Sequence, residues 1–348
     1  HLKYVVVDEC HTYRGVFGAN VALVLRRLLR IAAAYGSSPT LIYASATAAD
    51  PAGQARRLSG REAVAITDDA APAGERTIVL WEPGFIDGAE GEGGAPVRYP
   101  ATAEAASVSA ELLLQGARTL TFVRSRRAAE TVAMRTQEHL SAAGRADMAE
   151  RVAPYRAGYL AEDRRELERR LDNGELLGVA STNALELGID VGGLDAVVMA
   201  GFPGTVASFR QQAGRAGRRG QSSVAVLVAR DEPMDTYLVH HPEALLGKPV
   251  ENSVFDPTNP FILRGHVYCA AVERPLSEAD VDAFGARDVV DDLTAAGLLR
   301  RRPAGWFAVP QLDGEITPES AHASVSLRGG VGEQVMIVDV TDGRLLGT

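Results

Sequence analysis

Short apolar runs of strand length alternate with helical patterns at the start of the chain. Residues 4–7 (YVVV) and 40–44 (TLIYA) are continuous apolar runs that end in polar residues, as is typical of buried parallel strands. After a loop over 12–17, residues 20–35 are expected to form an amphipathic helix. Its apolar face would hold Val21, Leu25, Leu28 and Leu29, and its outer face Arg26, Arg27 and Arg30. The strand–helix–strand order predicts an α/β unit.

The same apolar runs recur along the middle of the chain. We expect strands near 63–66 and 77–81, which complete the first unit, and then over 119–123, 152–155, 176–180, 196–200 and 224–228. Residues 82–100 are rich in Gly, Glu, Ala and Pro, and this composition predicts a flexible linker between two units. Parallel α/β sheets bind ligands at the carboxyl ends of their strands, so the polar residues that follow the strands are the functional candidates.

A different pattern occupies the last part of the chain. Residues 276–307 combine helical spacing with the sequence L-x-x-x-G-L-L and a Trp-Phe pair. This suits a small winged-helix unit in which Leu293, Leu298 and Leu299 pack inside and Trp306 lies on the wing. A plain helical connector is the alternative.

Composition and charge narrow the class of protein. The chain has 348 residues, of which 46% are hydrophobic and 23% charged, as in soluble proteins of two or three domains. It shows no apolar run of transmembrane length and no signal peptide, which favours a cytoplasmic location without a membrane partner. Cys10 and Cys269 are too few for a disulfide framework or a four-cysteine zinc site. The net charge of −9 argues against a general polyanion-coating protein but allows a local nucleic-acid track.

The densest candidate chemistry lies between Ser181 and Arg219. The segment reads STNALELGID, then an apolar strand, then SFRQQAGRAGRRG. We expect a helix that carries Gln211, Arg215 and Arg218 on one face, because residues three and four apart are neighbours on a helix. Two arginines on a preset face suit a polyphosphate, since the guanidinium fork matches phosphate oxygens. A solvated arginine-rich helix is the alternative reading.

Four motifs in a fixed order carry a family resemblance. DECH at Asp8–His11, SAT at Ser45–Thr47, GID at 188–190 and Q-x-x-G-R-x-G-R from Gln211 resemble motifs II, III, V and VI of superfamily 2 helicases. The segment TFVRSRRAAE, around Ser125, is similar to motif IV of these enzymes.

The segment after these motifs resembles a narrower family, the repair helicases of the MrfA, YprA and Hrq type. The shared pattern is H-P…E…D-P-x-N-P…H…C-A-A…E-x-P. It falls on His241, Pro242, Glu251, Asp256, Pro257, Asn259, Pro260, His266, Cys269, Ala270, Ala271, Glu273 and Pro275.

The resemblance implies an α/β fold with two RecA-like lobes, the first truncated, followed by a winged-helix-like unit and the start of a β-rich C-terminal region. The implied boundaries are 1–81 for the first lobe, 82–100 for the linker, 101–232 for the second lobe, 233–275 for a family-specific connector, 276–310 for the winged-helix-like unit and 311–348 for the β-rich start. The chain begins inside the motif II strand and contains no G-x-x-x-x-G-K-[ST] loop, so we expect it to be part of a longer protein.

The resemblance also implies an ATP and Mg²⁺ site. Asp8 would hold Mg²⁺ through water, and Glu9 would orient or deprotonate the attacking water. Gly188 and Asp190 would approach the nucleotide. Gln211 would lie beside the γ-phosphate, and Arg215 and Arg218 would act as arginine fingers that stabilise the transferred phosphoryl group. Without such partners, Asp8 and Glu9 would be an ordinary acidic pair in a turn.

The remaining motif residues would couple hydrolysis to a bound strand. By resemblance, His11, Ser45 and Thr47 link the hydrolysis site to lobe movement. Ser125, Arg126, Thr182 and Arg156 would contact the nucleic-acid backbone, the first two at a helix N-terminus that favours anions. For Ser125 and Arg126, a capped helix with surface arginines is an equally good reading.

The predicted function is that of an ATP-dependent DNA helicase in DNA repair, which tracks 3′ to 5′ on single-stranded or tailed DNA. A superfamily 2 RNA helicase is the first alternative, although DECH and Gln211 differ from the DEAD and initial His that are usual in DEAD-box RNA helicases. A nucleic-acid-binding module without catalysis is the second alternative. It applies above all to the chain in isolation, which lacks the phosphate-binding lysine.

Overall fold

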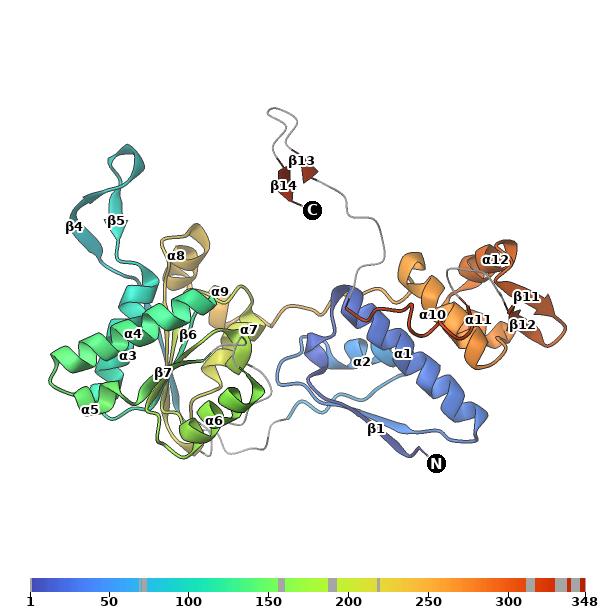
Figure 1. Ribbon diagram of the computed structural model, residues 1–348, viewed down its shortest axis with the longest axis horizontal. Helices are drawn as coiled ribbons and strands as arrows, with labels where there is room; N and C mark the ends of the chain where they lie inside the picture. The colour runs from blue at the N-terminus through green and yellow to red at the C-terminus, as the bar shows by residue number, and fades with distance from the viewer. Residues whose placement is uncertain are drawn as a thin grey trace. The chain divides into compact units, whose positions relative to one another are not determined.

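The chain forms two compact units in the computed structural model (Figure 1). The structure describes residues 2–68, 70, 74–155, 160–186, 193–217, 220–310, 317–328, 337–338 and 345–347. One unit is continuous, Thr67–Glu251, and the other joins His1–Ile66 to Asn252–Thr348. Each unit is described by itself below.

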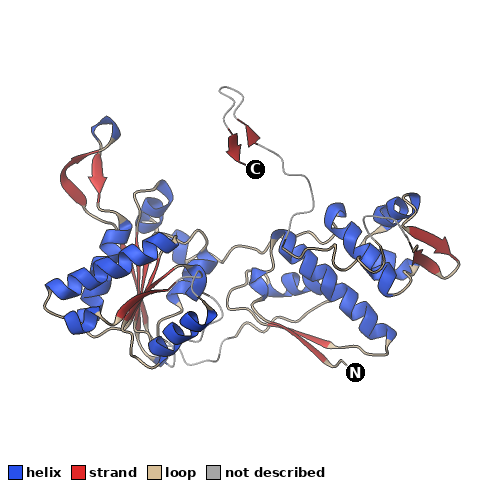
Figure 2. Cartoon of the chain, viewed as in Figure 1, coloured by secondary structure: helices blue, strands red, loops and turns tan. Residues whose placement is uncertain are grey.

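The continuous unit is built on a six-stranded parallel sheet in the order β3-β10-β9-β6-β8-β7. The strands are β3 (Arg76–Trp81), β6 (Thr119–Phe122), β7 (Val152–Tyr155), β8 (Gly178–Ser181), β9 (Ala196–Ala200) and β10 (Ser223–Val228). The helices are α3 (Ala101–Leu114), α4 (Arg126–Ala142), α5 (Ala146–Ala149), α6 (Ala161–Asp172), α7 (Val206–Ala213), α8 (Pro233–His240) and α9 (Pro242–Leu246) (Figure 2).

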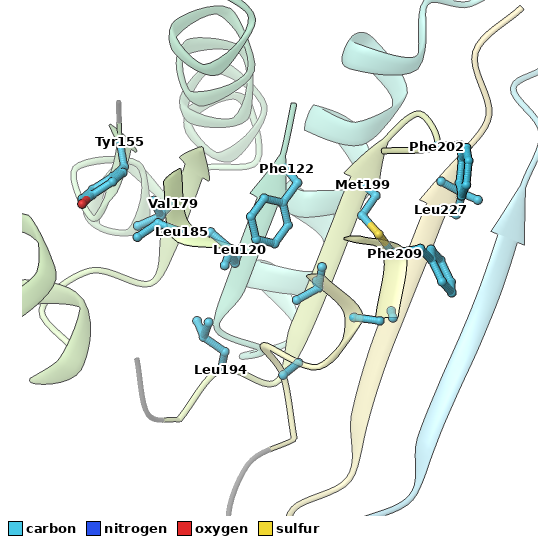
Figure 3. Close-up of a cluster of buried hydrophobic side chains, with 14 of the residues drawn as sticks. Leu120, Phe122, Tyr155, Val179, Leu185, Leu194, Met199, Phe202, Phe209 and Leu227 are labelled. Atoms are coloured by element: carbon cyan, nitrogen blue, oxygen red, sulfur yellow. The ribbon is translucent and has the colours of Figure 1, made fainter. Parts of the chain in front are cut away.

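Two apolar clusters cover the two faces of this sheet. One holds alanines of α3 together with Val132 of α4 and Val198 of β9. The other holds Phe209 of α7 and Leu171 of α6, with Phe122 and Met199 from the strands (Figure 3). Burial on both faces explains why these strands read as continuous apolar runs rather than as alternating ones.

Three predictions at the end of the first lobe are wrong. The strand expected near 77–81 is β3, which pairs with β10 and so belongs to the continuous unit. Its alternate residues pack on both apolar clusters, Ile78 and Leu80 on one and Val79 on the other, and this burial decides its place. Residues 63–66 form no strand; Val64 and Ile66 are 92% and 93% exposed. The expected linker 82–100 contains a hairpin of β4 (Phe85–Glu90) and β5 (Pro96–Arg98), joined through η2 (Glu92–Gly94).

The discontinuous unit begins with β1 (Tyr4–Val7) and β2 (Thr40–Tyr43), which pair in parallel. The short turn η1 (Cys10–Thr12) leads into α1 (Gly15–Ala34), which starts earlier than the sequence predicts, and α2 (Pro51–Ser59) packs against α1. Val7, Ala22, Leu25 and Leu58 form a small core between strand and helices. This is the strand–helix–strand unit that the apolar pattern predicts.

The rest of this unit has the helix–helix–hairpin order of a winged helix. It contains α10 (Pro260–Glu273), α11 (Glu278–Phe284), α12 (Arg287–Ala295), and an antiparallel hairpin of β11 (Leu299–Arg302) and β12 (Gly305–Ala308). Trp306 lies on the hairpin as expected, but it is 2% exposed and packs with Leu293 and Leu299. Beyond residue 310, the described strands are β13 (Ile337–Val338) and β14 (Leu345–Gly347).

A buried polar cluster joins α1 to α10. Arg27 was expected on the outer face of its helix, but it is 8% exposed and pairs with Glu273. Its Nη1 lies 3.2 Å from Nδ1 of His266, whose Nε2 lies 2.9 Å from Oδ1 of Asn20. An arginine can only donate, so Nδ1 of His266 accepts and Nε2–H donates to Asn20. The packing of α10 on α1 therefore overrides the simple amphipathic pattern and holds a neutral imidazole.

This cluster predicts acid sensitivity of folding. Burial, and then the charge of Arg27, lower the pKa of His266 to about 4. The unfolded imidazole binds a proton below about pH 6.5, whereas the folded one does so only near pH 4, so stability is lost as pH falls through this window. The loss is at most about 3 kcal/mol.

Chemical denaturation at pH 7.5, 6, 5 and 4.5 tests this expectation. His266→Gln should be less stable at pH 7.5 and should show a flatter dependence on pH than the wild type. His139→Asn, which changes an exposed histidine of α4, should keep the wild-type slope. Equal slopes for wild type and His266→Gln would contradict the assignment.

Candidate nucleotide and nucleic-acid sites

In the discontinuous unit, two predicted motifs follow neighbouring parallel strands. Asp8 and Glu9 come directly after β1, and Ser45 to Thr47 come after β2. Because β1 and β2 pair in parallel, the two motifs lie at the same edge of the sheet. Asp8 is exposed and the Glu9 side chain is 37% exposed, so both carboxylates are open to solvent.

The turn at Glu9 has an unusual backbone. Glu9 adopts φ 47° and ψ 42°, and no other non-glycine residue in the described ranges has a positive φ. Its carbonyl accepts from Oγ1 of Thr12 at 2.8 Å, and its N–H donates to Oδ1 of Asp8 at 2.8 Å. On the next residue, the Cys10 carbonyl accepts from Nε2 of Gln54 at 2.6 Å. Side chains from neighbouring segments therefore hold this strained turn in place.

The structure brings together the three predicted coupling residues. Nδ1 of His11 lies 3.1 Å from Oγ of Ser45 and 3.4 Å from a carboxylate oxygen of Glu9. The Ser45 hydroxyl donates to the carbonyl of Thr47 at 2.9 Å, so its oxygen is left to accept from Nδ1–H of His11. The imidazole thus connects a motif II carboxylate to the motif III hydroxyl.

Sequence reasoning missed a segment that closes on this turn. Oγ of Ser253 donates to the carbonyl of His11 at 3.1 Å, and the N–H of Gly15 donates to the carbonyl of Val254 at 2.8 Å. Phe255 is 7% exposed within the core that includes Val7 and Cys10. The only signal was position, because these residues directly precede Asp256 and Pro257 of the family pattern.

In the continuous unit, the candidate nucleic-acid residues also follow neighbouring strands. Ser125 follows β6 and caps α4 by accepting from the N–H of Ala128 at 3.1 Å, and Arg126 is the exposed first residue of that helix. Thr182 follows β8, which pairs with β6, so it lies at the same sheet edge and is 9% exposed. Arg156 follows β7 in the sequence and lies outside the described residues.

The motif VI helix is shorter than predicted. We expected one helix to carry Gln211, Arg215 and Arg218, but α7 ends at Ala213 and Arg215 lies in the turn beyond it. Gly214 ends the helix and Gly217 has φ 77°, a value that favours glycine and breaks helical geometry. Arg218, Gly188 and Asp190 lie outside the described residues.

Glu186 is an anchor for motif VI that sequence reasoning also missed. Arg215 is 9% exposed and donates through Nη2 to the carbonyl of Glu186. Nε2 of Gln212 donates to the carboxylate of the same residue at 2.8 Å. Gln211, also 9% exposed, precedes this pair on α7. The segment that precedes GID therefore holds the predicted arginine finger inside one unit.

Comparison with known proteins decides the family. The model of the helicase conserved C-terminal domain matches residues 104–220, and that of the winged helix domain of ATP-dependent helicase HRQ1 matches residues 255–330. The chain is 40% identical over 343 residues to the "Uncharacterized ATP-dependent helicase YprA" of Bacillus subtilis, covering 98% of this chain. It is also 40% identical to ATP-dependent helicase HRQ1 of Saccharomyces cerevisiae, covering 99% of this chain. The chain belongs to the YprA/Hrq/MrfA family of helicases.

Solved structures agree with this membership. The DUF1998 helicase MrfA bound to DNA and AMPPNP matches with a TM-score of 0.82 and 40% identity over 99% of this chain and 46% of that one. The Mycobacterium smegmatis helicase Lhr bound to ssDNA and AMP-PNP matches with a TM-score of 0.63 and 26% identity over 88% and 41%. The α/β fold with RecA-like lobes and a winged helix is therefore confirmed.

This member of the helicase family spans 44% of YprA and 32% of HRQ1, less than half of each relative. Within the described part of the chain, no helix is both long and apolar enough to cross a membrane.

The close packing around the motif II turn predicts an unusual effect of a helical alanine. Gly18→Ala would place Cβ 2.6 Å from the carbonyl carbon of Tyr13 and 3.0 Å from Cγ of Phe255. A glycine-to-alanine change in an open helix stabilises by about 1 kcal/mol. Here we expect destabilisation of about 1–3 kcal/mol, because backbone and an aromatic ring must shift.

Urea unfolding measures this change, with Gly265→Ala in α10 as the control. Its Cβ would meet only a methyl group of Val325, at 3.2 Å, which can move. A Gly18→Ala protein as stable as the wild type would show that the packing at Tyr13 and Phe255 is looser than described.

Proposed function

We propose that this protein is the motor part of an ATP-dependent DNA helicase that translocates 3′ to 5′ on single-stranded DNA and acts in DNA repair. The observation that carries the proposal is the likeness to MrfA bound to DNA and AMPPNP, at 40% identity over 99% of the chain. The four helicase motifs stand in the expected order, and the described ones follow strand ends or the α7 helix.

In the proposed ATP site, Asp8 and Glu9 have separate tasks. Asp8 would hold Mg²⁺ through water, and that ion, when bound, neutralises charge on the phosphates. A single exposed carboxylate at a strand end fits contact through water better than direct coordination by several ligands. Glu9 would accept the proton of the attacking water, and His11 would hold its carboxylate at 3.4 Å.

On the other unit, Arg215 and Gln211 would read the γ-phosphate, together with Arg218. Arg215 donates to the carbonyl of Glu186 in this structure, so service as an arginine finger requires it to exchange that carbonyl for phosphate oxygens. A neutral acceptor is the weaker partner for a guanidinium, and the exchange is favourable once the phosphates are present. Gly188 and Asp190 would contact the nucleotide beside them.

The proposed nucleic-acid contacts lie at the carboxyl edge of the six-stranded sheet. The N-terminus of α4, capped by Ser125, offers backbone N–H groups and a positive dipole end to a phosphate, and Arg126 adds a charge. Thr182 follows the neighbouring strand, and Arg156 would contribute from the next one. We place the protein in the cytoplasm, which its two free cysteines fit.

The first test compares ATP hydrolysis by the complete gene product without nucleic acid, with single-stranded DNA and with single-stranded RNA. We expect strong stimulation by DNA. Glu9→Gln removes the general base but keeps the size of the side chain, so kcat should fall about 100-fold or more. DNA affinity, measured by fluorescence anisotropy, should stay within a few-fold of the wild type.

Glu62→Gln, a change at a side chain that is 86% exposed, is the matched control and should hydrolyse ATP like the wild type. Stimulation by RNA alone would overturn the DNA assignment. Hydrolysis that survives in Glu9→Gln would overturn the role of Glu9, and no hydrolysis under any condition would leave a nucleic-acid-binding module.

A further inference from the structure

A short segment after the second unit contacts both predicted halves of the ATP-hydrolysis machinery. We call residues 251–255 the strap. Glu251 is the last residue of the continuous unit, and Asn252 is the first residue of the returning part of the other unit. The family pattern includes Glu251 but gives no role to it, and Ser253, Val254 and Phe255 lie outside that pattern.

The first end of the strap fixes the motif VI helix. The Glu251 carboxylate accepts from the N–H of Val206 at 2.7 Å and from the N–H of Ala207 at 3.2 Å. These are the first two residues of α7, where a carboxylate satisfies free N–H groups and complements the helix dipole. The helix that is capped in this way carries Gln211 and leads directly to Arg215.

The second end of the strap fixes the motif II turn. Ser253 donates to the carbonyl of His11, and Val254 accepts from Gly15, so two strap residues bracket the turn that follows Glu9. Phe255 then anchors the strap in the core beside Val7, the residue that precedes Asp8. His11 is thus held on both sides, its ring by Ser45 and its carbonyl by Ser253.

One residue of chain separates the two contacts. Asn252 alone lies between Glu251 and Ser253, and two peptide steps span at most about 7 Å. A displacement of the α7 N-terminus therefore cannot be absorbed by slack in the chain. It must pull on Ser253 or break one of the two sets of hydrogen bonds.

We propose that residues 251–255 are a positioning element for ATP hydrolysis, which fixes the motif II turn relative to the N-terminus of the motif VI helix. This inference rests on the proposed function, because it assigns a role in the hydrolysis that Glu9, Gln211 and Arg215 would perform. Ser253 and Glu251 touch no reacting atom in this account and act only through His11 and α7.

The test uses nucleic-acid-stimulated ATP hydrolysis by the complete gene product. We expect Ser253→Ala to lower kcat about tenfold, to leave KM for ATP within about twofold, and to leave the melting temperature close to that of the wild type. Ser253→Thr keeps the hydroxyl and should restore most of kcat. Ser141→Ala, at an exposed serine of α4, is the matched control and should behave like the wild type.

A double-mutant cycle separates a strap from two unrelated contacts. Glu251→Gln should also lower kcat, with Glu138→Gln on the exposed side of α4 as its control. If the strap acts as one element, the double variant Glu251→Gln/Ser253→Ala loses no more than the stronger single variant. Losses that multiply would overturn the inference.

Two further outcomes contradict the strap. Wild-type kcat in Ser253→Ala is one, and a loss that simply follows a lower melting temperature and disappears on cooling is the other. Failure of the proposed function looks different, because the wild-type protein itself would then hydrolyse no ATP.

Discussion

The turn at Glu9 is the constraint on which the rest of the candidate site depends. A non-glycine residue in the left-handed region costs about 1–2 kcal/mol, and this one also carries the predicted general base. The turn persists because surrounding groups hold it: Thr12 and Gln54 bind its carbonyls, Ser45 binds the His11 ring, and Ser253 binds the His11 carbonyl. Strain of this kind at a site of proposed catalysis fits a turn whose geometry serves chemistry rather than folding.

Each unit solves the same placement problem in the same way. Parallel strands bring their carboxyl ends to one edge, so residues distant in sequence, such as Asp8 and Ser45 or Ser125 and Thr182, become neighbours. The α1–α10 joint adds a second theme, since Arg27, Asn20, Glu273 and His266 form a buried polar cluster between the first unit's long helix and the winged helix. Removing one partner from such a cluster costs more than removing an exposed pair.

The sequence allowed prediction of what depends on local pattern and failed where tertiary contacts decide. The apolar runs correctly indicated strands such as 119–123 and 196–200, and the motif spacing correctly indicated the helicase family. The strand at 77–81 was placed in the wrong unit, because pairing with β10 is a non-local choice that no spacing encodes. Arg27 looked solvated for the same reason, and the contacts of Glu186, Glu251 and Ser253 arise only when the chain returns on itself.

The most direct test of the account is strand displacement by the complete gene product on a labelled DNA duplex with a 3′ single-stranded tail, beside the same duplex with a 5′ tail. The account predicts that ATP drives displacement on the 3′-tailed duplex, that AMPPNP does not, and that the 5′-tailed duplex stays paired. Displacement of neither duplex with ATP present, in a protein that binds the DNA, would contradict the claim that these two units form a DNA motor.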